Sequence, residues 1–255
     1  MKNSQQKLTL KVLTYNVHGC KGTDGRVLTD RIAKVISQYE PDVVCLQELD
    51  LNRKRSGGMD QPHRIAQHLE MMYHFYPSMQ IEEEQYGNAI LSRYPMQLIK
   101  AEKLPNISGK GKNESRGALW VSIKIQDIAV QLFNTHLSLF RNERILQMDT
   151  LLSDGWLKNQ KCLGPAVVCG DFNAWTCSSA YHKIRRVLND VQILKSSHRL
   201  KATWHSLFPF SRIDHIFVSL GIEVQEVLVP NTKLTRQASD HLPLIAELKI
   251  KSKTL

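Results

Sequence analysis

The chain has 255 residues, a length that suits one large domain with a single hydrophobic core, so we expect one domain over residues 1–255. Hydrophobic residues make up 42% and charged residues 23%, an ordinary globular mixture that argues against disorder. No run reaches the roughly 18–20 apolar residues that a membrane-spanning helix needs. The net charge of +10 favours anionic ligands such as nucleic acid, phospholipid headgroups or phosphorylated small molecules, without choosing among them.

Periodicity along the chain predicts alternating strands and helices. In chain order we expect a strand over 8–16, a helix over 28–39, strands over 42–48 and 87–92, a hairpin of strands over 117–125 and 128–137, a helix over 143–157, and strands over 166–170, 213–218 and 242–250. Segment 42–48 is continuously apolar, as expected for a strand buried on both faces, and Pro41 ends the helix before it. Strands outnumber helices, which predicts a mixed α/β protein with helices covering β-sheets.

The five cysteines are scattered, and none stands in a Cys-x-x-Cys pair. This pattern disfavours both a disulfide framework and a structural zinc site. Cys45 and Cys169 lie within apolar runs and are expected to be buried as small hydrophobic residues. The N-terminal residues are polar and contain no apolar signal core. We therefore expect a cytoplasmic protein, and we expect it to be a monomer.

Polar residues cluster where the predicted strands end. Eight of them terminate or adjoin an apolar strand: Asn16, Glu48, His136, Asp171, Asn173, Asp214, Asp240 and His241. Any one of these could be a helix cap or a turn former, but eight at strand ends indicate a crevice into which rigid elements project side chains. Carboxylates and amides without thiolates suit a hard cation, Mg²⁺ or Mn²⁺, better than zinc.

Seven short motifs carry these residues in order along the chain. They are Tyr-Asn16-Val-His18-Gly, Pro-Asp-Val-Val-Cys-Leu-Gln47-Glu48, Gly87-Asn88-Ala-Ile-Leu-Ser-Arg93-Tyr-Pro, Asn134-Thr-His136-Leu, Gly170-Asp171-Phe-Asn173, Arg212-Ile-Asp214-His-Ile-Phe and Ser239-Asp240-His241-Leu-Pro. In this order the chain resembles the endonuclease/exonuclease/phosphatase superfamily, which includes abasic-site endonucleases, neutral sphingomyelinases and inositol polyphosphate 5-phosphatases. The resemblance implies a four-layer α/β sandwich of two facing mixed β-sheets flanked by helices. It also implies cleavage of phosphate esters with one or two divalent cations.

The resemblance further implies a role for each motif residue. Glu48 resembles the principal metal ligand, and Asn16 and Asp240 would complete the metal site. Asp171 would align and deprotonate the attacking water, and Asn173 would donate hydrogen bonds to the phosphorane oxygens. His136 would contact the phosphate. His241 paired with Asp214 resembles the family's His–Asp dyad, in which the histidine either stabilises the phosphate or transfers a proton. These roles make chemical sense, because phosphoryl transfer depends mainly on charge neutralisation and positioning.

Three further residues are candidates for substrate binding. His18 stands where abasic-site endonucleases commonly carry an aspartate, and it could be a substitute metal ligand, a phosphate contact or a loop residue. Arg116 opens a predicted strand, and it could contact phosphate or simply be solvated. Trp204 belongs to an aromatic cluster over 203–210, where it could wall the substrate pocket or lie in the core.

The sequence leaves the substrate open. Basic segments at 51–64, 100–116 and 182–201 would attract a polyanion if they rim the crevice, or they could be solvated loops. The first expectation is a phosphodiesterase that cleaves nucleic acid. The alternative is a phospholipase C-like or phosphatase activity on a phospholipid or phosphorylated small molecule. A non-catalytic anion-binding module is a third possibility, but it predicts the loss of a central acid or amide, and all of them are present.

Overall fold

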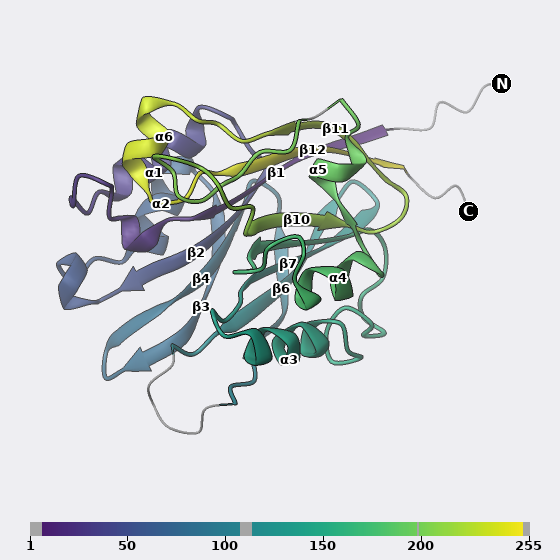
Figure 1. The fold of residues 1–255 in the computed structure, drawn as a ribbon, viewed down its shortest axis with the longest axis horizontal. Coiled ribbons are helices and arrows are strands. Elements are labelled where there is room, and N and C mark those ends of the chain that lie inside the picture. Colours follow the sequence, from purple (N-terminus) through teal and green to yellow (C-terminus); the bar gives the residue numbers. More distant parts are fainter. Residues whose placement is uncertain (1–6, 108–113, 198, 252–255) are drawn as a thin grey trace.

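The computed structural model describes residues 7–107, 114–197 and 199–251, and it contains two six-stranded mixed sheets with helices on their outer faces (Figure 1). This confirms the expected four-layer α/β sandwich. Lys110 and Lys112, which belong to the expected basic segment 100–116, lie outside the described residues. None of the described helices is long and apolar enough to cross a membrane.

The first sheet combines strands from both ends of the chain. Across the sheet the order is β11 (Ile222–Leu228), β12 (Leu244–Lys251), β1 (Lys7–Asn16), β2 (Val43–Leu51), β4 (Glu84–Ser92) and β3 (Met72–Ile81). Only β1 and β2 run parallel, and the other neighbours are antiparallel. Residues at the ends of β1 and β2 therefore emerge at the same edge of the sheet.

The second sheet is built from a continuous middle part of the chain and repeats this arrangement. Its order is β5 (Met96–Lys103), β6 (Gly117–Ile125), β7 (Ile128–His136), β8 (Ala166–Asp171), β10 (Asp214–Val218) and β9 (Asn189–Asp190). Again only one central pair, β7 and β8, is parallel. Both sheets thus carry a central parallel pair whose carboxyl ends are followed by polar residues.

The main hydrophobic core lies between the two sheets, because its buried residues alternate along strands of both, such as Leu10 and Val12 on β1 and Leu132 on β7. Cys45 and Cys169 are buried in this core, as predicted. The helices are α1 (Thr29–Ser37), α2 (Gln61–Leu69), α3 (Arg141–Leu151), α4 (Ser179–Arg185), α5 (Val191–Leu194) and α6 (Lys233–Ala238). Residues of α1, α2 and α6 pack on the outer face of the first sheet, and those of α3 and α4 on the second (Figure 1).

Several elements differ from the sequence prediction. The helix expected over 143–157 is α3 and ends at Leu151, because Ser153 donates its hydroxyl to the Thr150 carbonyl and accepts from the Gly155 N–H, which forms a turn instead. The basic segments are not simply loops. Segment 51–64 contains the start of α2, capped by Asp60, and segment 182–201 contains α5 and most of α4.

Candidate active site

The candidate site lies where the two parallel strand pairs end. The first sheet contributes Asn16 from β1 and Glu48 from β2, and the second contributes His136 from β7 and Asp171 from β8. The remaining residues come from antiparallel neighbours, whose starts reach the same edge. Asp214 begins β10 directly opposite Asp171, and Asp240 and His241 precede β12, the neighbour of β1.

The backbone departs from regular geometry at two of these residues. Glu48 adopts a φ of 63° at an irregularity in the pairing of β2 with β4, between Leu46 and Leu49. Asn173 adopts a φ of 45° just after β8. Residues other than glycine rarely occupy this left-handed region, and such strain concentrates at functional sites. The irregularity in β2 takes Glu48 out of the regular strand alternation.

Gly170 explains how Asp171 reaches the site. Its φ is +143°, and a Cβ at this position would collide with the backbone carbonyl oxygen of Thr135 on the neighbouring strand. Only glycine allows β7 and β8 to approach this closely. The pairing then places Asp171 directly opposite His136.

Asn16 ties together the carboxylates of the two sheets. Its Nδ2 donates to Glu48 Oε1 at 2.8 Å and to Asp171 Oδ2 at 2.9 Å. The backbone N–H of His18 donates to Asn16 Oδ1 at 3.0 Å, which fixes the orientation of the amide. Asn16 therefore presents its nitrogen to the two carboxylates and orients them.

Arg116 sets the hydrogen-bonding state of His136. Arg116 is buried, not solvated, and its Nη1 donates to His136 Nδ1 at 3.0 Å. Burial and the Arg116 charge together lower the pKa of His136 well below its usual range. The neutral ring then carries its proton on Nε2, which lies 3.1 Å from Asn173 Nδ2. Both nitrogens can therefore donate to one anionic oxygen that lies to the side of this pair.

His241 and Asp214 form the expected pair. His241 Nδ1 lies 2.8 Å from Asp214 Oδ2, and both side chains are buried. Burial opposes the charge on His241, but the Asp214 carboxylate outweighs it and raises the pKa of His241 to about 10. The ring is therefore an imidazolium near neutrality, and its Nε2 lies 3.7 Å from Asp171 Oδ2.

The two carboxylates nearest Asn16 differ in their electrostatics. Burial, followed by repulsion from Asp214, raises the pKa of Asp171 to about 7. Burial also disfavours the charge on Glu48, but the hydrogen bonds from His18 and Asn16 outweigh it and hold its pKa below the usual range. One carboxyl group is therefore firmly ionised, and the other is close to the neutral range in which a general base works best.

His18 lies between two carboxylates of the first-sheet side. Its Nδ1 is 3.5 Å from Glu48 Oε2 and 3.7 Å from Asp240 Oδ1, and the hydrogen bond with Glu48 raises the pKa of His18. His18 and Asp240 also line a cavity of about 300 Å³, together with Lys21, His205 and Leu207 among others. Trp204 does not line this cavity; its Nε1 donates to Asp240 Oδ2 at 3.3 Å.

The donor set fits a divalent cation. Ligand atoms of Glu48, His136 and Asp171 lie within 4.8 Å of one another, as do those of Asp171, Asp214 and His241. Because His241 is protonated and His136 carries its proton on Nε2, the carboxylates are the available ligands. Oδ1 of the buried Asp214 has no hydrogen-bond partner among the described residues. Anionic oxygen donors of this kind suit Mg²⁺ or Mn²⁺.

Two buried amides that the sequence analysis left without a role connect the sheets. Gln47 Nε2, on the first sheet, donates to Asn134 Oδ1, on the second, at 2.7 Å. Asn134 Nδ2 in turn donates to the carbonyls of Leu46 and Ala89. Both amides belong to the motifs quoted above, and each lies within two residues of a site residue. This amide bridge fixes the sheets relative to each other beside the site.

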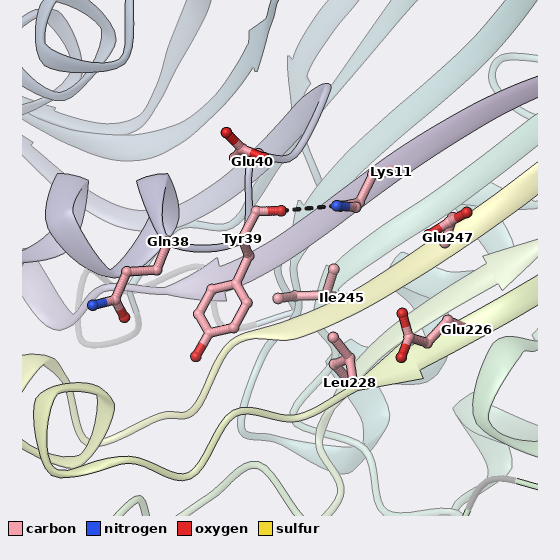
Figure 2. A pocket seen from close by; sticks show the side chains of 8 residues that line it. All are labelled: Lys11, Gln38, Tyr39, Glu40, Glu226, Leu228, Ile245 and Glu247. Atoms are coloured by element: carbon pink, nitrogen blue, oxygen red, sulfur yellow. Dashed lines mark hydrogen bonds between the residues drawn. The ribbon is translucent and has the colours of Figure 1, made fainter.

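A separate cavity of about 170 Å³ lies on the outer side of the first sheet (Figure 2). Lys11, which donates to the Tyr39 carbonyl at 3.1 Å, lines it with Glu40, Glu226 and Glu247. None of the candidate site residues lines this cavity. Its lining carries charges of both signs and lacks the converging hydrogen-bond donors found at the strand ends. The candidate active site is therefore the one at the strand ends.

Comparison with known proteins agrees with this geometry. The YbhP protein of Escherichia coli (strain K12), itself described as uncharacterized, is 27% identical over 98% of this chain and all of its own length. The mannosyl-6-phosphatase Bt3783 of Bacteroides thetaiotaomicron shares the fold, with a TM-score of 0.78 and 22% identity over 94% of this chain and 99% of that one. A Beutenbergia cavernae endonuclease/exonuclease/phosphatase has a TM-score of 0.76 and 24% identity over 96% of this chain and 72% of its own.

The family model described as Endonuclease/Exonuclease/phosphatase family matches residues 13–241, which include every one of the seven motifs apart from the end of the seventh. Members of this family are phosphoric ester hydrolases. By this match and by its fold, the chain belongs to the endonuclease/exonuclease/phosphatase family.

Proposed function

We propose that this chain is a divalent-metal-dependent phosphodiesterase that cleaves a nucleic-acid phosphodiester by in-line attack of water. One observation carries the reaction class. Carboxylates, an imidazolium and paired N–H donors converge at one edge of the two sheets, with ligand atoms of Glu48, His136 and Asp171 within 4.8 Å of one another. This is the combination of anionic and donor groups that phosphoryl transfer requires.

The side chains have separate roles in the proposed reaction. When bound, the cation polarises the phosphate oxygens and neutralises their charge. Glu48 and Asp240 would hold it, and Asn16 orients Glu48. Asp171, whose two carboxylate oxygens accept from Asn16 Nδ2 and from the Asn173 N–H, takes the proton of the attacking water.

The phosphate oxygens lie against the donors on the other side. His136 and Asn173 donate hydrogen bonds to them, because their N–H groups face the same space. His241, kept protonated by Asp214, stabilises the developing negative charge. Arg116 acts through His136, whose tautomer it selects.

The charge of the chain favours nucleic acid as the substrate. The net charge of +10 gives a field that attracts a polyanion and raises its association rate. A phospholipid diester is the second candidate, and a specific observation favours it. Leu207 lines the cavity beside Asp240, and its neighbours Phe208 and Phe210 are exposed, Phe208 to 82%. Exposed apolar side chains next to a site are suited to acyl chains.

The test is hydrolysis of bis(p-nitrophenyl) phosphate and p-nitrophenyl phosphate with Mg²⁺, with Mn²⁺ and with EDTA. An Asp171→Asn variant serves as the control, because it keeps the side-chain shape but removes the base. We expect turnover of the diester that requires metal and disappears in the variant. A preference for the monoester would redirect the search toward phosphatase substrates, and no metal-dependent turnover of either ester would count against the proposed reaction.

The substrate is tested next by comparing single-stranded DNA, RNA and phosphatidylcholine vesicles under the same conditions. Cleavage of an oligonucleotide without release of phosphocholine from the vesicles supports the first candidate. The reverse result replaces it with the second candidate.

A further inference from the structure

A basic cavity lies on the second-sheet side of the molecule, apart from the residues discussed so far. Its volume is about 550 Å³, and it is formed by α4, α5 and the segments around Thr176 and Arg212. Three arginines line it, Arg185, Arg186 and Arg212, together with His182 and Tyr181. Ile193 and Leu200 form an apolar wall. We refer to it as the basic cavity.

The positive charge in the basic cavity is only partly balanced. Arg212 Nη2 donates to Asp190 Oδ2 at 2.8 Å, but Asp190 also accepts from the Tyr181 hydroxyl. Arg212 is 11% exposed, and its Nε has no hydrogen-bond partner among the described residues. Within the described part of the chain, no carboxylate forms an ion pair with the guanidinium of Arg185 or Arg186. Arg212 is thus paired with one buried carboxylate, and the guanidinium groups of Arg185 and Arg186 add further positive charge to the lining, which leaves an excess suited to an anion.

The basic cavity is adjacent to the candidate active site along the chain. Thr176 follows Asn173 by three residues, and Arg212 precedes Asp214 by two. Since a residue spans at most about 3.6 Å, the Cα atoms of these pairs lie within roughly 11 and 7 Å of each other. Trp175, which is 57% exposed, stands between Asn173 and Thr176 in the sequence.

We propose that the basic cavity binds a second phosphate group of the substrate while the first occupies the active site. Guanidinium groups bind phosphate oxygens through two parallel hydrogen bonds, and three of them can surround one phosphate. The exposed indole of Trp175 would pack against the part of the substrate that joins the two phosphates. The second phosphate belongs either to a neighbouring nucleotide of a single strand or to a polyphosphorylated small molecule. This inference rests on the proposed function for the position of the first phosphate.

The chain offers a matched control for testing this proposal. Arg185→Gln/Arg186→Gln removes two charges from the basic cavity. Lys183→Gln removes a charge from the same helix, but Lys183 does not line the cavity and its Nζ pairs with Asp149 at 2.7 Å. Arg186 is exposed, so Arg186→Gln alone keeps the test valid if the double variant fails to fold.

Binding is measured in EDTA, without turnover, by fluorescence anisotropy of a short fluorescein-labelled oligothymidylate and by calorimetric titration with inositol hexakisphosphate. For the probe that matches the substrate we expect the double variant to bind roughly tenfold or more weakly than the unaltered chain. If that probe is the oligothymidylate, the slope of log K against log salt becomes shallower by about 0.7 for each phosphate that the double variant no longer neutralises. Lys183→Gln should bind either probe like the unaltered chain.

Each result decides the proposal. A selective loss of oligothymidylate binding supports it and assigns the second phosphate to nucleic acid, whereas a selective loss of inositol hexakisphosphate binding supports it with a small-molecule source. Equal binding of both probes by the double variant and Lys183→Gln overturns it, as does the absence of binding to the unaltered chain. Hydrolysis of bis(p-nitrophenyl) phosphate, which has one phosphate, should be unchanged in the double variant. If the unaltered chain does not hydrolyse bis(p-nitrophenyl) phosphate, that result would reject the proposed function but not phosphate binding in the basic cavity.

Discussion

The two sheets repeat one architecture, a central parallel pair ending at the site, but they contribute side chains of different character. On the second sheet the site residues are almost completely buried, with exposed fractions of 4% for His136, 2% for Asp171 and 0% for Asp214. On the first-sheet side Asn16 is fully buried, but the carboxylates are more open, with exposed fractions of 21% for Glu48 and 26% for Asp240.

This difference in exposure indicates that the two sides of the site have different roles. The buried residues of the second sheet are held by hydrogen bonds to one another and to Arg116, so their protonation states are set before a ligand arrives. On the more open first-sheet side, Asp240 and His18 line a cavity and can exchange water for a ligand.

The buried side is tested most directly at His241, which belongs to the loop before β12 but is paired with Asp214 of the second sheet. His241→Asn keeps an N–H facing Asp214 and removes Nε2, so we expect turnover to fall by about 10²–10⁴-fold while the chain stays folded. Steady-state kinetics and circular dichroism check this. His68→Ala, on the exposed surface of α2, is the control. Normal turnover in His241→Asn would remove the imidazolium from the mechanism.

The open side is tested at Glu48. Glu48→Gln keeps the hydrogen bond from Asn16 but removes the anionic ligand, so metal affinity measured by isothermal titration should fall by about 100-fold or more. Glu247→Gln, in the cavity of Figure 2, makes the same change far from the site and should leave affinity unchanged. Equal metal affinity in both variants would show that Glu48 is not a ligand.

Arg116 allows a finer test of the buried side. Arg116→Gln should remove the preference of the His136 ring for the tautomer protonated on Nε2. Because Arg116 acts through His136, we expect kcat to fall by about tenfold. Nitrogen chemical shifts of the His136 ring report the tautomer directly, and Arg116→Lys should restore part of the original spectrum. A ring whose shifts do not change in Arg116→Gln would contradict the positioning role.

The smallest effect is expected at His18. His18→Asp exchanges an imidazole for a carboxylate between Glu48 and Asp240, which should shift preference from Mn²⁺ toward Mg²⁺ by less than about tenfold. Competition dialysis of the two ions measures the shift. His205→Asp, on the wall of the same cavity, adds the same charge without facing Glu48. An equal shift in both variants would indicate a general charge effect.

The sequence predicted the central strands well, because they are buried on both faces and read as continuous apolar runs ending in polar residues. Strand β2 and the pair β7–β8 are examples, and they carry Glu48, His136 and Asp171. The edge strands β3 and β5 were missed because most of their residues are partly exposed, and β3 also contains Pro77. Tertiary pairing determines such strands more than local pattern does.

The sequence could place residues at one edge, but not say which atoms face each other. Asn16 was expected at the metal site, but the sequence could not show that its oxygen accepts from the His18 N–H while its nitrogen faces Glu48 and Asp171. The burial of Arg116, directly before β6, against His136 of β7 likewise depends on a contact between residues twenty positions apart. The cavity lined by Arg185, Arg186 and Arg212 has no local signal beyond positive charge.

The amide bridge between Gln47 and Asn134 has a consequence for how activity responds to movement of one sheet relative to the other. Each sheet is stabilised by its own helices, but the candidate site exists only where the edges of the two sheets meet, and there ligand atoms of Glu48, His136 and Asp171 lie within 4.8 Å of one another. A displacement of about 1 Å there is enough to impair catalysis severely. Activity should therefore behave as a property of the junction between the sheets. On warming, activity should be lost at the temperature at which the two sheets begin to shift relative to each other, while the strands of both sheets are still formed.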